Sequence, residues 1–177
     1  PTVIISKGRS ITLLGNVFEA KGGVGVWVHE SNLVTVVGNS FARGQARGLS
    51  CDRSQMTVEG NAFVGDWPMA LSVDKGCSIE VRRNLFFENQ TSVTISALAS
   101  RVIVERNSFI RSPAALKITG SPGNLNLTDN LFFECAFAIL SSGELSPKKT
   151  GRNAVWRSKL QANGRPLNAL DLVRTEP

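Results

Sequence analysis

The chain has 177 residues and a formal net charge of +6, with 42% hydrophobic and 19% charged residues. This length supports one domain with a continuous core and is too short for two independent ones. No run approaches the roughly 18 uninterrupted apolar residues that a membrane-spanning helix requires, and the start lacks the basic-then-apolar pattern of a secretory signal.

The first apolar positions, Val3 and Ile5, stand 13 and 11 residues before Asn16. Val26 and Val28 stand at the same distances before Asn39. This match predicts that the chain opens in the middle of a repeating unit, with no covering segment at that end.

A short motif, Asn followed two residues later by an aromatic residue, recurs along the chain at intervals of 22 or 23 residues. The pairs are Asn16/Phe18, Asn39/Phe41, Asn61/Phe63, Asn84/Phe86, Asn107/Phe109 and Asn130/Phe132, with an echo at Asn153. A fixed period of this length is typical of stacked supersecondary units.

Each Asn follows a stretch that alternates apolar and polar residues, which predicts a strand with one buried face. Its inward pairs are Ile11/Leu13, Val34/Val36, Met56/Val58, Ile79/Val81, Val102/Val104 and Leu125/Leu127. A second strand is predicted after each Phe and a short loop. Its inward pairs are Val26/Val28, Leu49/Cys51, Leu71/Val73, Val93/Ile95, Leu116/Ile118 and Ile139/Ser141.

About 23 residues suit one turn of a wide coil, and stacking coils about 4.8 Å apart pairs each strand with its equivalents above and below. The sequence therefore predicts an all-β parallel β-helix of six to seven coils. Each phenylalanine should stack on the next inside, and the asparagine amides should hydrogen-bond along the stack. We expect the asparagines themselves to adopt left-handed backbone geometry at the corner, eased by a preceding Gly15, Gly38 or Gly60.

These repeats resemble the right-handed parallel β-helix repeats of the pectin-lyase-like superfamily, of the carbohydrate-binding and sugar-hydrolase type, over about residues 3 to 142. The resemblance implies right-handed coils. It also implies that a helix or another segment covers the open first coil. Relatives in that superfamily include polysaccharide lyases, hydrolases, epimerases and noncatalytic interaction domains, so the fold alone does not select a function.

We expect coils over residues 1–143 and a degenerate last coil with an irregular C-terminal cap over 144–177, where Pro147, Lys148 and Lys149 interrupt the pattern. A short helix is predicted near Ser158 to Ala162. The expected contacts of the cap with the core are Trp156, Leu160, Leu167, Leu170 and Leu172.

The three cysteines, Cys51, Cys77 and Cys135, are an odd number without the spacing of a metal site. We expect them to be reduced, which favours a reducing, cytoplasmic compartment. The positive net charge is compatible with an acidic polysaccharide. Because the basic residues are scattered among acidic ones and no aromatic residues interleave with them, a nucleic-acid partner is disfavoured.

Candidate chemistry lies at the outer side of the second strand, near its end, where equivalent positions read His29, Asp52, Asp74, Ser96, Thr119 and Ser142. The next position reads Glu30, Arg53 and Lys75 in the first three of these coils. This polar cluster would bring a histidine, three carboxylates and two cations close together along the axis.

The polar cluster has a catalytic and a structural interpretation. Asp52 and Asp74 could bind Ca²⁺ or act as acid and base, with Arg53, Lys75 or His29 removing a proton beside a uronate carboxylate. The local motifs of alginate epimerases and polygalacturonases are absent, however, and alternating charges also stabilise an ordinary solvated coil edge. We expect no cofactor and no metal unless the catalytic interpretation holds.

Two tryptophans could provide a platform for a sugar ring. Trp27 should point outward beside His29, and Trp67 could either extend this platform or pack against the flank of the coils.

The sequence thus leaves three hypotheses. We expect a noncatalytic module that binds a polysaccharide or a protein partner through one outer face. The alternatives are a lyase or epimerase acting on uronic-acid polymers and a structural spacer among further domains of a longer chain.

Overall fold

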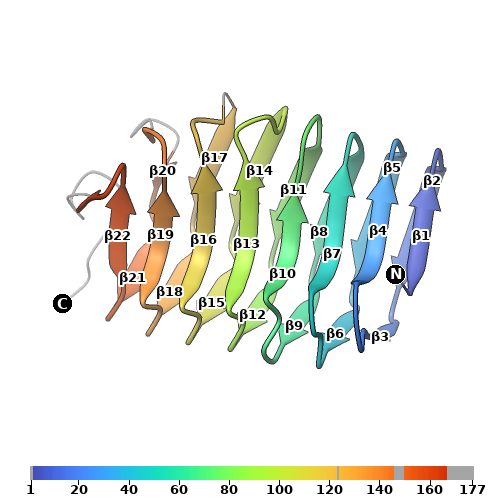
Figure 1. The fold of residues 1–177 in the computed structure, drawn as a ribbon, viewed down its shortest axis with the longest axis horizontal. Helices are drawn as coiled ribbons and strands as arrows, with labels where there is room; N and C mark the ends of the chain where they lie inside the picture. Colours follow the sequence, from blue (N-terminus) through green and yellow to red (C-terminus); the bar gives the residue numbers. More distant parts are fainter. Residues whose placement is uncertain (1, 123, 146–149, 167–177) are drawn as a thin grey trace.

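The computed structural model describes residues 2–122, 124–145 and 150–166. Within them the chain winds as a three-sided parallel β-helix, with coils stacked side by side along the long axis of the molecule (Figure 1). The described residues contain strands and turns and no helix, and so no segment of them could cross a membrane as an apolar helix.

Each side of the coil is a parallel sheet, apart from one antiparallel pairing at the end of the first (β22 with β23). Sheet A contains β1 (Val3–Ser6), β4 (Val24–His29), β7 (Arg47–Asp52), β10 (Met69–Val73), β13 (Thr91–Ser96), β16 (Ala114–Thr119), β19 (Phe137–Ser141), β22 (Lys159–Ala162) and β23 (Arg165–Pro166). Sheet B contains β2 (Arg9–Leu14), β5 (Asn32–Val37), β8 (Gln55–Glu59), β11 (Ser78–Arg82), β14 (Arg101–Glu105), β17 (Leu125–Thr128) and β20 (Thr150–Gly151). Sheet C contains β3 (Val17–Glu19), β6 (Ser40–Ala42), β9 (Ala62–Val64), β12 (Leu85–Phe87), β15 (Ser108–Ile110), β18 (Leu131–Phe133) and β21 (Ala154–Trp156).

The structure adds a third strand to the two that the repeat predicted for each coil. The phenylalanine sits at the centre of the short strand of sheet C, for example Phe86 in β12. A strand of three residues has one inward position, so it produces no alternation that a sequence pattern could reveal.

The phenylalanines form a continuous stack inside the coil. Phe18, Phe41, Phe63, Phe86, Phe109 and Phe132 are all buried. Consecutive ring centroids lie between 4.4 and 5.0 Å apart. This stack and the inward pairs of sheets A and B make up one hydrophobic core.

The asparagines form a ladder at the corner between sheets B and C. Asn84 Nδ2 donates to Asn107 Oδ1 in the next coil, to Val58 O in the preceding one and to Arg82 O in its own. Asn84 Oδ1 accepts from both the backbone N–H and the Nδ2 of Asn61. The amide therefore bonds backbone groups of two successive coils at the corner, where the Asn61 N–H has left the sheet ladders.

We expected the asparagine itself to have the left-handed conformation at this corner, and this prediction is wrong. The residue before it has that conformation. Positive φ angles of 53° to 66° occur at Gly15, Gly38, Gly60, Arg83, Arg106, Asp129 and Arg152. The turn occurs one residue earlier than predicted and leaves the asparagine free to aim its amide along the stack.

Cys51 and Cys77 are joined by a disulfide, with Cα atoms 6.1 Å apart, so the prediction of three reduced cysteines is wrong for these two. Cys77 shares a repeat position with Ser31 and Ser54, whose hydroxyls accept backbone N–H groups at the corner between sheets A and B. Cys51 faces this corner from the coil before Cys77, at the end of β7. The prediction of a cytoplasmic compartment rested on reduced cysteines and therefore loses its support.

Beyond Gly143, the described residues up to Pro166 continue the sheets. β20, β21 and β22 add one strand to each sheet, and residues 159–162 form β22 where a helix was predicted. Leu160 packs against the core as expected, whereas Trp156 is exposed on the outer face of sheet C, contrary to its predicted role. Leu167, Leu170 and Leu172 lie outside the described residues.

Candidate functional site

The predicted polar cluster lies on the outer face of sheet A, at the ends of β4, β7 and β10. His29 is in register with Asp52, and the next step along the same column leads to Asp74. The residues following them are held in step by backbone bonds from Glu30 N to Asp52 O and from Arg53 N to Lys75 O. Parallel pairing thus brings together residues that are about 23 positions apart in the chain.

His29 is bound on both sides of its ring. Its Nδ1 lies 2.8 Å from Asp52 Oδ2, and its Nε2 lies 3.2 Å from Arg53 Nη2. A guanidinium can only donate, so Nε2 accepts and the proton of the neutral ring resides on Nδ1. Arg53 also contacts Glu30 Oε1 at 3.0 Å, and these four side chains form one charged network.

Asp74 belongs to a second network on the same face. Its Oδ2 accepts from Ser72 Oγ at 3.0 Å and from Ser50 Oγ at 3.3 Å, and it lies 3.6 Å from Arg47 Nη1. The two serines are buried although they point outward from the sheet.

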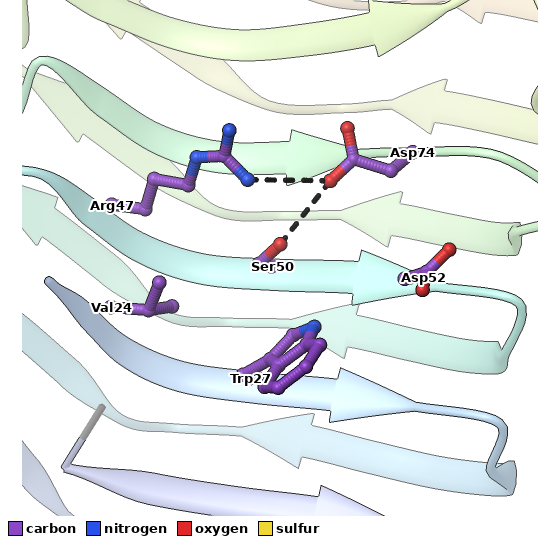
Figure 2. A pocket seen from close by; sticks show the side chains of 6 residues that line it. All are labelled: Val24, Trp27, Arg47, Ser50, Asp52 and Asp74. Carbon is purple, nitrogen blue, oxygen red and sulfur yellow. Dashed lines mark hydrogen bonds and ion pairs between the residues drawn. The ribbon is translucent and has the colours of Figure 1, made fainter.

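A shallow groove of about 520 Å³ opens between these networks, lined by Val24, Trp27, Arg47, Ser50, Asp52 and Asp74. Figure 2 shows the indole of Trp27 on β4, Ser50 on the neighbouring β7, and Arg47 and Asp74 joined above them. The Trp27 ring points outward beside His29, as predicted, with ring centroids 5.1 Å apart.

Sequence reasoning missed Val24, Arg47 and Ser50 as parts of this site. Each stands in register with a neighbour across the sheet: Val24 with Arg47, and Trp27 with Ser50. Arg47 begins its strand, five residues before Asp52. The repeat spacing could have located these positions, but in the adjacent coils the two columns that contain Arg47 and Ser50 have no charged residue.

Trp67 does not extend the platform, because its side chain is fully buried. Its Nε1 donates to Phe41 O, and its ring occupies the space over Gly44, where any Cβ would collide with it. Asn89 and Cys135 contact the corresponding carbonyls of Phe63 and Phe109 in later coils. Trp67 is therefore a corner residue of the core, and its prediction as a ligand-binding residue is wrong.

The carboxylates of the site face separate partners rather than one another. Asp52 contacts His29 and Arg53, while Asp74 contacts the two serines and Arg47. Among the described residues, no three His, Cys, Asp or Glu side chains gather closely enough to hold a metal ion. What the site offers chemically is an aromatic surface, a guanidinium with 40% side-chain exposure and two carboxylates with acceptor oxygens.

One comparison bears on this architecture. Residues 2–143 match the family model of the right handed beta helix region. The chain belongs to this right-handed β-helix family. The match confirms the predicted fold class and shows that the coils of this β-helix protein are right-handed. No curated protein and no solved structure matches the chain.

Proposed function

We propose that this β-helix protein is a noncatalytic module that binds an acidic polysaccharide across the outer face of sheet A. The observation that carries the proposal is the groove in which an indole, a guanidinium and two carboxylates line one rigid, shallow surface. Rigid elements present such groups with little loss of conformational freedom on binding.

Each group in the groove suits one part of a uronic-acid polymer. The Trp27 ring offers an apolar surface to the C–H side of a pyranose. The Arg47 guanidinium can form two parallel hydrogen bonds with a carboxylate. Asp52 and Asp74 are acceptors for sugar hydroxyls.

The same column continues along the stack with hydroxyl side chains. Ser96, Thr119 and Ser142 follow Asp52 and Asp74 in successive coils. Because successive coils are about 4.8 Å apart, a polymer lying along the axis would meet an equivalent polar side chain at each step. An extended chain fits this surface better than a single small sugar.

A noncatalytic role is supported by the contacts of His29. Its Nε2 is already an acceptor for Arg53 Nη2, and its Nδ1–H is engaged by Asp52. A general base needs a free nitrogen within hydrogen-bond reach of the proton that it removes. Breaking this network would be required before His29 could act.

Binding should be measured by calorimetry with polygalacturonate and alginate as probes and neutral dextran as comparator. We expect both acidic polymers to bind more tightly than dextran. Trp27→Ala and Arg47→Gln should each weaken binding about tenfold, the effect of losing one stacking or charge-assisted contact. Arg101→Gln, which removes one positive charge on sheet B, is the matched control and should bind like the wild type. Equal losses in all three variants would mean nonspecific attraction and would refute the proposal.

A lyase or epimerase remains the second candidate, and the 2.8 Å contact between His29 Nδ1 and Asp52 Oδ2 favours it. A carboxylate that orients a histidine is a common arrangement for a general base. Lyase activity would appear as ultraviolet absorbance of an unsaturated uronate on incubation with polygalacturonate or alginate. Absorbance that His29→Ala and Asp52→Ala abolish would establish this function instead of the proposed one.

A further inference from the structure

The outer face of sheet C carries a column of large apolar side chains, one from each of five consecutive coils. The register places Val64, Phe87, Ile110, Phe133 and Trp156 side by side. We call this column the apolar stripe. It lies on the outside of the solenoid, opposite the buried phenylalanine stack, where the winding of the coil requires no apolar residue.

The apolar stripe is open to solvent in the part of the chain that the structure describes. Val64 is 36% and Trp156 46% exposed, and the three residues between them are half-buried. In the neighbouring column Leu85 and Leu131 are 37% and 39% exposed. Contiguous exposed apolar side chains are a common feature of interaction sites.

One rim of the stripe is a ladder of alternating charges. Glu88, Arg111, Glu134 and Arg157 follow the strands of sheet C in four successive coils. Arg111 lies 3.7 Å from Glu88 and 3.5 Å from Glu134, and Arg157 lies 3.2 Å from Glu134. All four ladder residues have a positive φ, so the backbone turn sets the direction in which each side chain projects.

When this ladder is set against a second copy running in the opposite direction, every Glu faces an Arg and every Arg faces a Glu. We propose that the stripe is the interface of a homodimer in which a second copy packs face to face with its helix axis antiparallel. A two-fold axis between the coils of Arg111 and Glu134 sets Glu88 against Arg157 of the second copy and Arg111 against its Glu134. The same axis sets Ile110 against Phe133 of the second copy. One patch then serves both subunits, as an isologous interface requires.

The opposite rim selects the antiparallel arrangement over the parallel one. In the same four coils it carries Arg83, Arg106, Asp129 and Arg152. In a dimer with parallel helix axes, the Glu88 rim of one copy would face the Arg83 rim of the other. Like charges would then meet in three of the four coils. In the antiparallel dimer this rim meets itself reversed, and its attractive contacts between Arg106 and Asp129 offset the repulsive ones between Arg83 and Arg152. The charge ladder then decides the orientation.

The experiment is a charge-swap complementation followed by sedimentation velocity. The wild type is expected to be a dimer. Arg111→Glu and Glu134→Arg should each place like charges opposite one another twice in the dimer, raising the dissociation constant at least tenfold. An equimolar mixture of the two variants should form a heterodimer. Every charged side chain in the ladder of one variant then faces a side chain of opposite charge in the other. Arg101→Glu, whose guanidinium pairs with Glu80 on sheet B, is the control and should remain dimeric.

Circular dichroism establishes that each variant is folded before it is compared. Phe133→Ser, at a half-buried outward position, provides an independent variant and should also be a folded monomer. A monomeric wild type, single swaps that leave the dimer intact, or a mixture that does not reassociate would each overturn the antiparallel interface. The outcome does not depend on polysaccharide binding, because sheet A takes no part in the contact.

Discussion

At the scale of single residues, the corners of the coil are occupied by side chains that replace missing backbone partners. The asparagines do so between sheets B and C. Ser31 and Ser54 do so between sheets A and B, and Trp67, Asn89 and Cys135 between sheets C and A. A parallel coil must turn three times, and each turn withdraws N–H and C=O groups from the ladders while keeping them buried. Polar residues buried at corners are therefore structural here.

Asn84→Ala should destabilise the protein by about 3 to 5 kcal/mol, because it leaves the buried backbone N–H of Asn61 without a partner and removes a donor from the carbonyls of Val58 and Arg82, each loss costing roughly 1 to 3 kcal/mol. Urea unfolding measures the change. Asn16→Ala is the matched control, since Asn16 stands at the exposed start of the ladder. A similar loss at both positions would contradict the role of the ladder in the interior.

Burial raises the pKa of the Cys135 thiol above its usual value, and hydrogen bonds from its surroundings oppose this shift only in part. The folded state thus holds the proton more tightly than the unfolded state, so this group's contribution to stability falls as pH rises past the ordinary thiol pKa. We expect a thiol reagent to react slowly with the native protein at mildly alkaline pH and promptly with one thiol after unfolding without reductant. Rapid labelling of native protein would contradict the burial of Cys135.

At the scale of the strand, stability comes from columns rather than from any coil alone. Phe86 stacks on Phe63 and Phe109 with centroid distances of 4.8 and 4.9 Å, and all three rings are fully buried. No single coil could exclude water from its ring, so the stacking of neighbours creates the core.

Phe86→Ala should lower the free energy of unfolding by about 3 to 5 kcal/mol, since it removes a buried ring and leaves a cavity between two others. Phe137→Ala is the matched control, because this half-buried phenylalanine at the start of β19 lies outside the stack. Thermal or urea unfolding at equal protein concentration should show a much smaller loss for it. Equal losses would contradict the column as the main source of stability.

At the scale of the whole molecule, the two proposed binding surfaces lie on different sides of the coil. The outer face of sheet A bears the groove beside Trp27, and the outer face of sheet C bears the apolar stripe and its charged rim. The proposed dimer would leave both grooves open. Two linked grooves would increase the avidity for a polymer without any new contact to sugar.

The disulfide ties neighbouring coils beneath the groove, between Cys51 in β7 and Cys77 before β11. Closing a loop with a sequence separation of 26 should contribute about 3.5 kcal/mol by chain entropy. We expect reductant to lower the midpoint of thermal unfolding by several degrees. The double variant Cys51→Ser, Cys77→Ser should show a low midpoint in either condition. A wild-type midpoint that does not respond to full reduction would contradict the contribution of this bond.

The sequence alone determined the 23-residue winding, the inward pairs, the phenylalanine stack and the asparagine ladder. Stacking converts one repeat position into a line of neighbours, so a periodic pattern already contains these contacts. It also located His29, Asp52 and Asp74 in one column, because the same translation relates them.

Only the tertiary structure decided the features that depend on the path of the backbone within a coil. The third strand, the left-handed residue before each asparagine, the burial of Trp67 and the bond between Cys51 and Cys77 all lie at or beside corners. There the direction of a side chain follows from the turn and not from alternation. The addition of Arg47 to the groove likewise required the register of whole strands, because a repeat period gives the spacing between coils but not which side chains meet across a face.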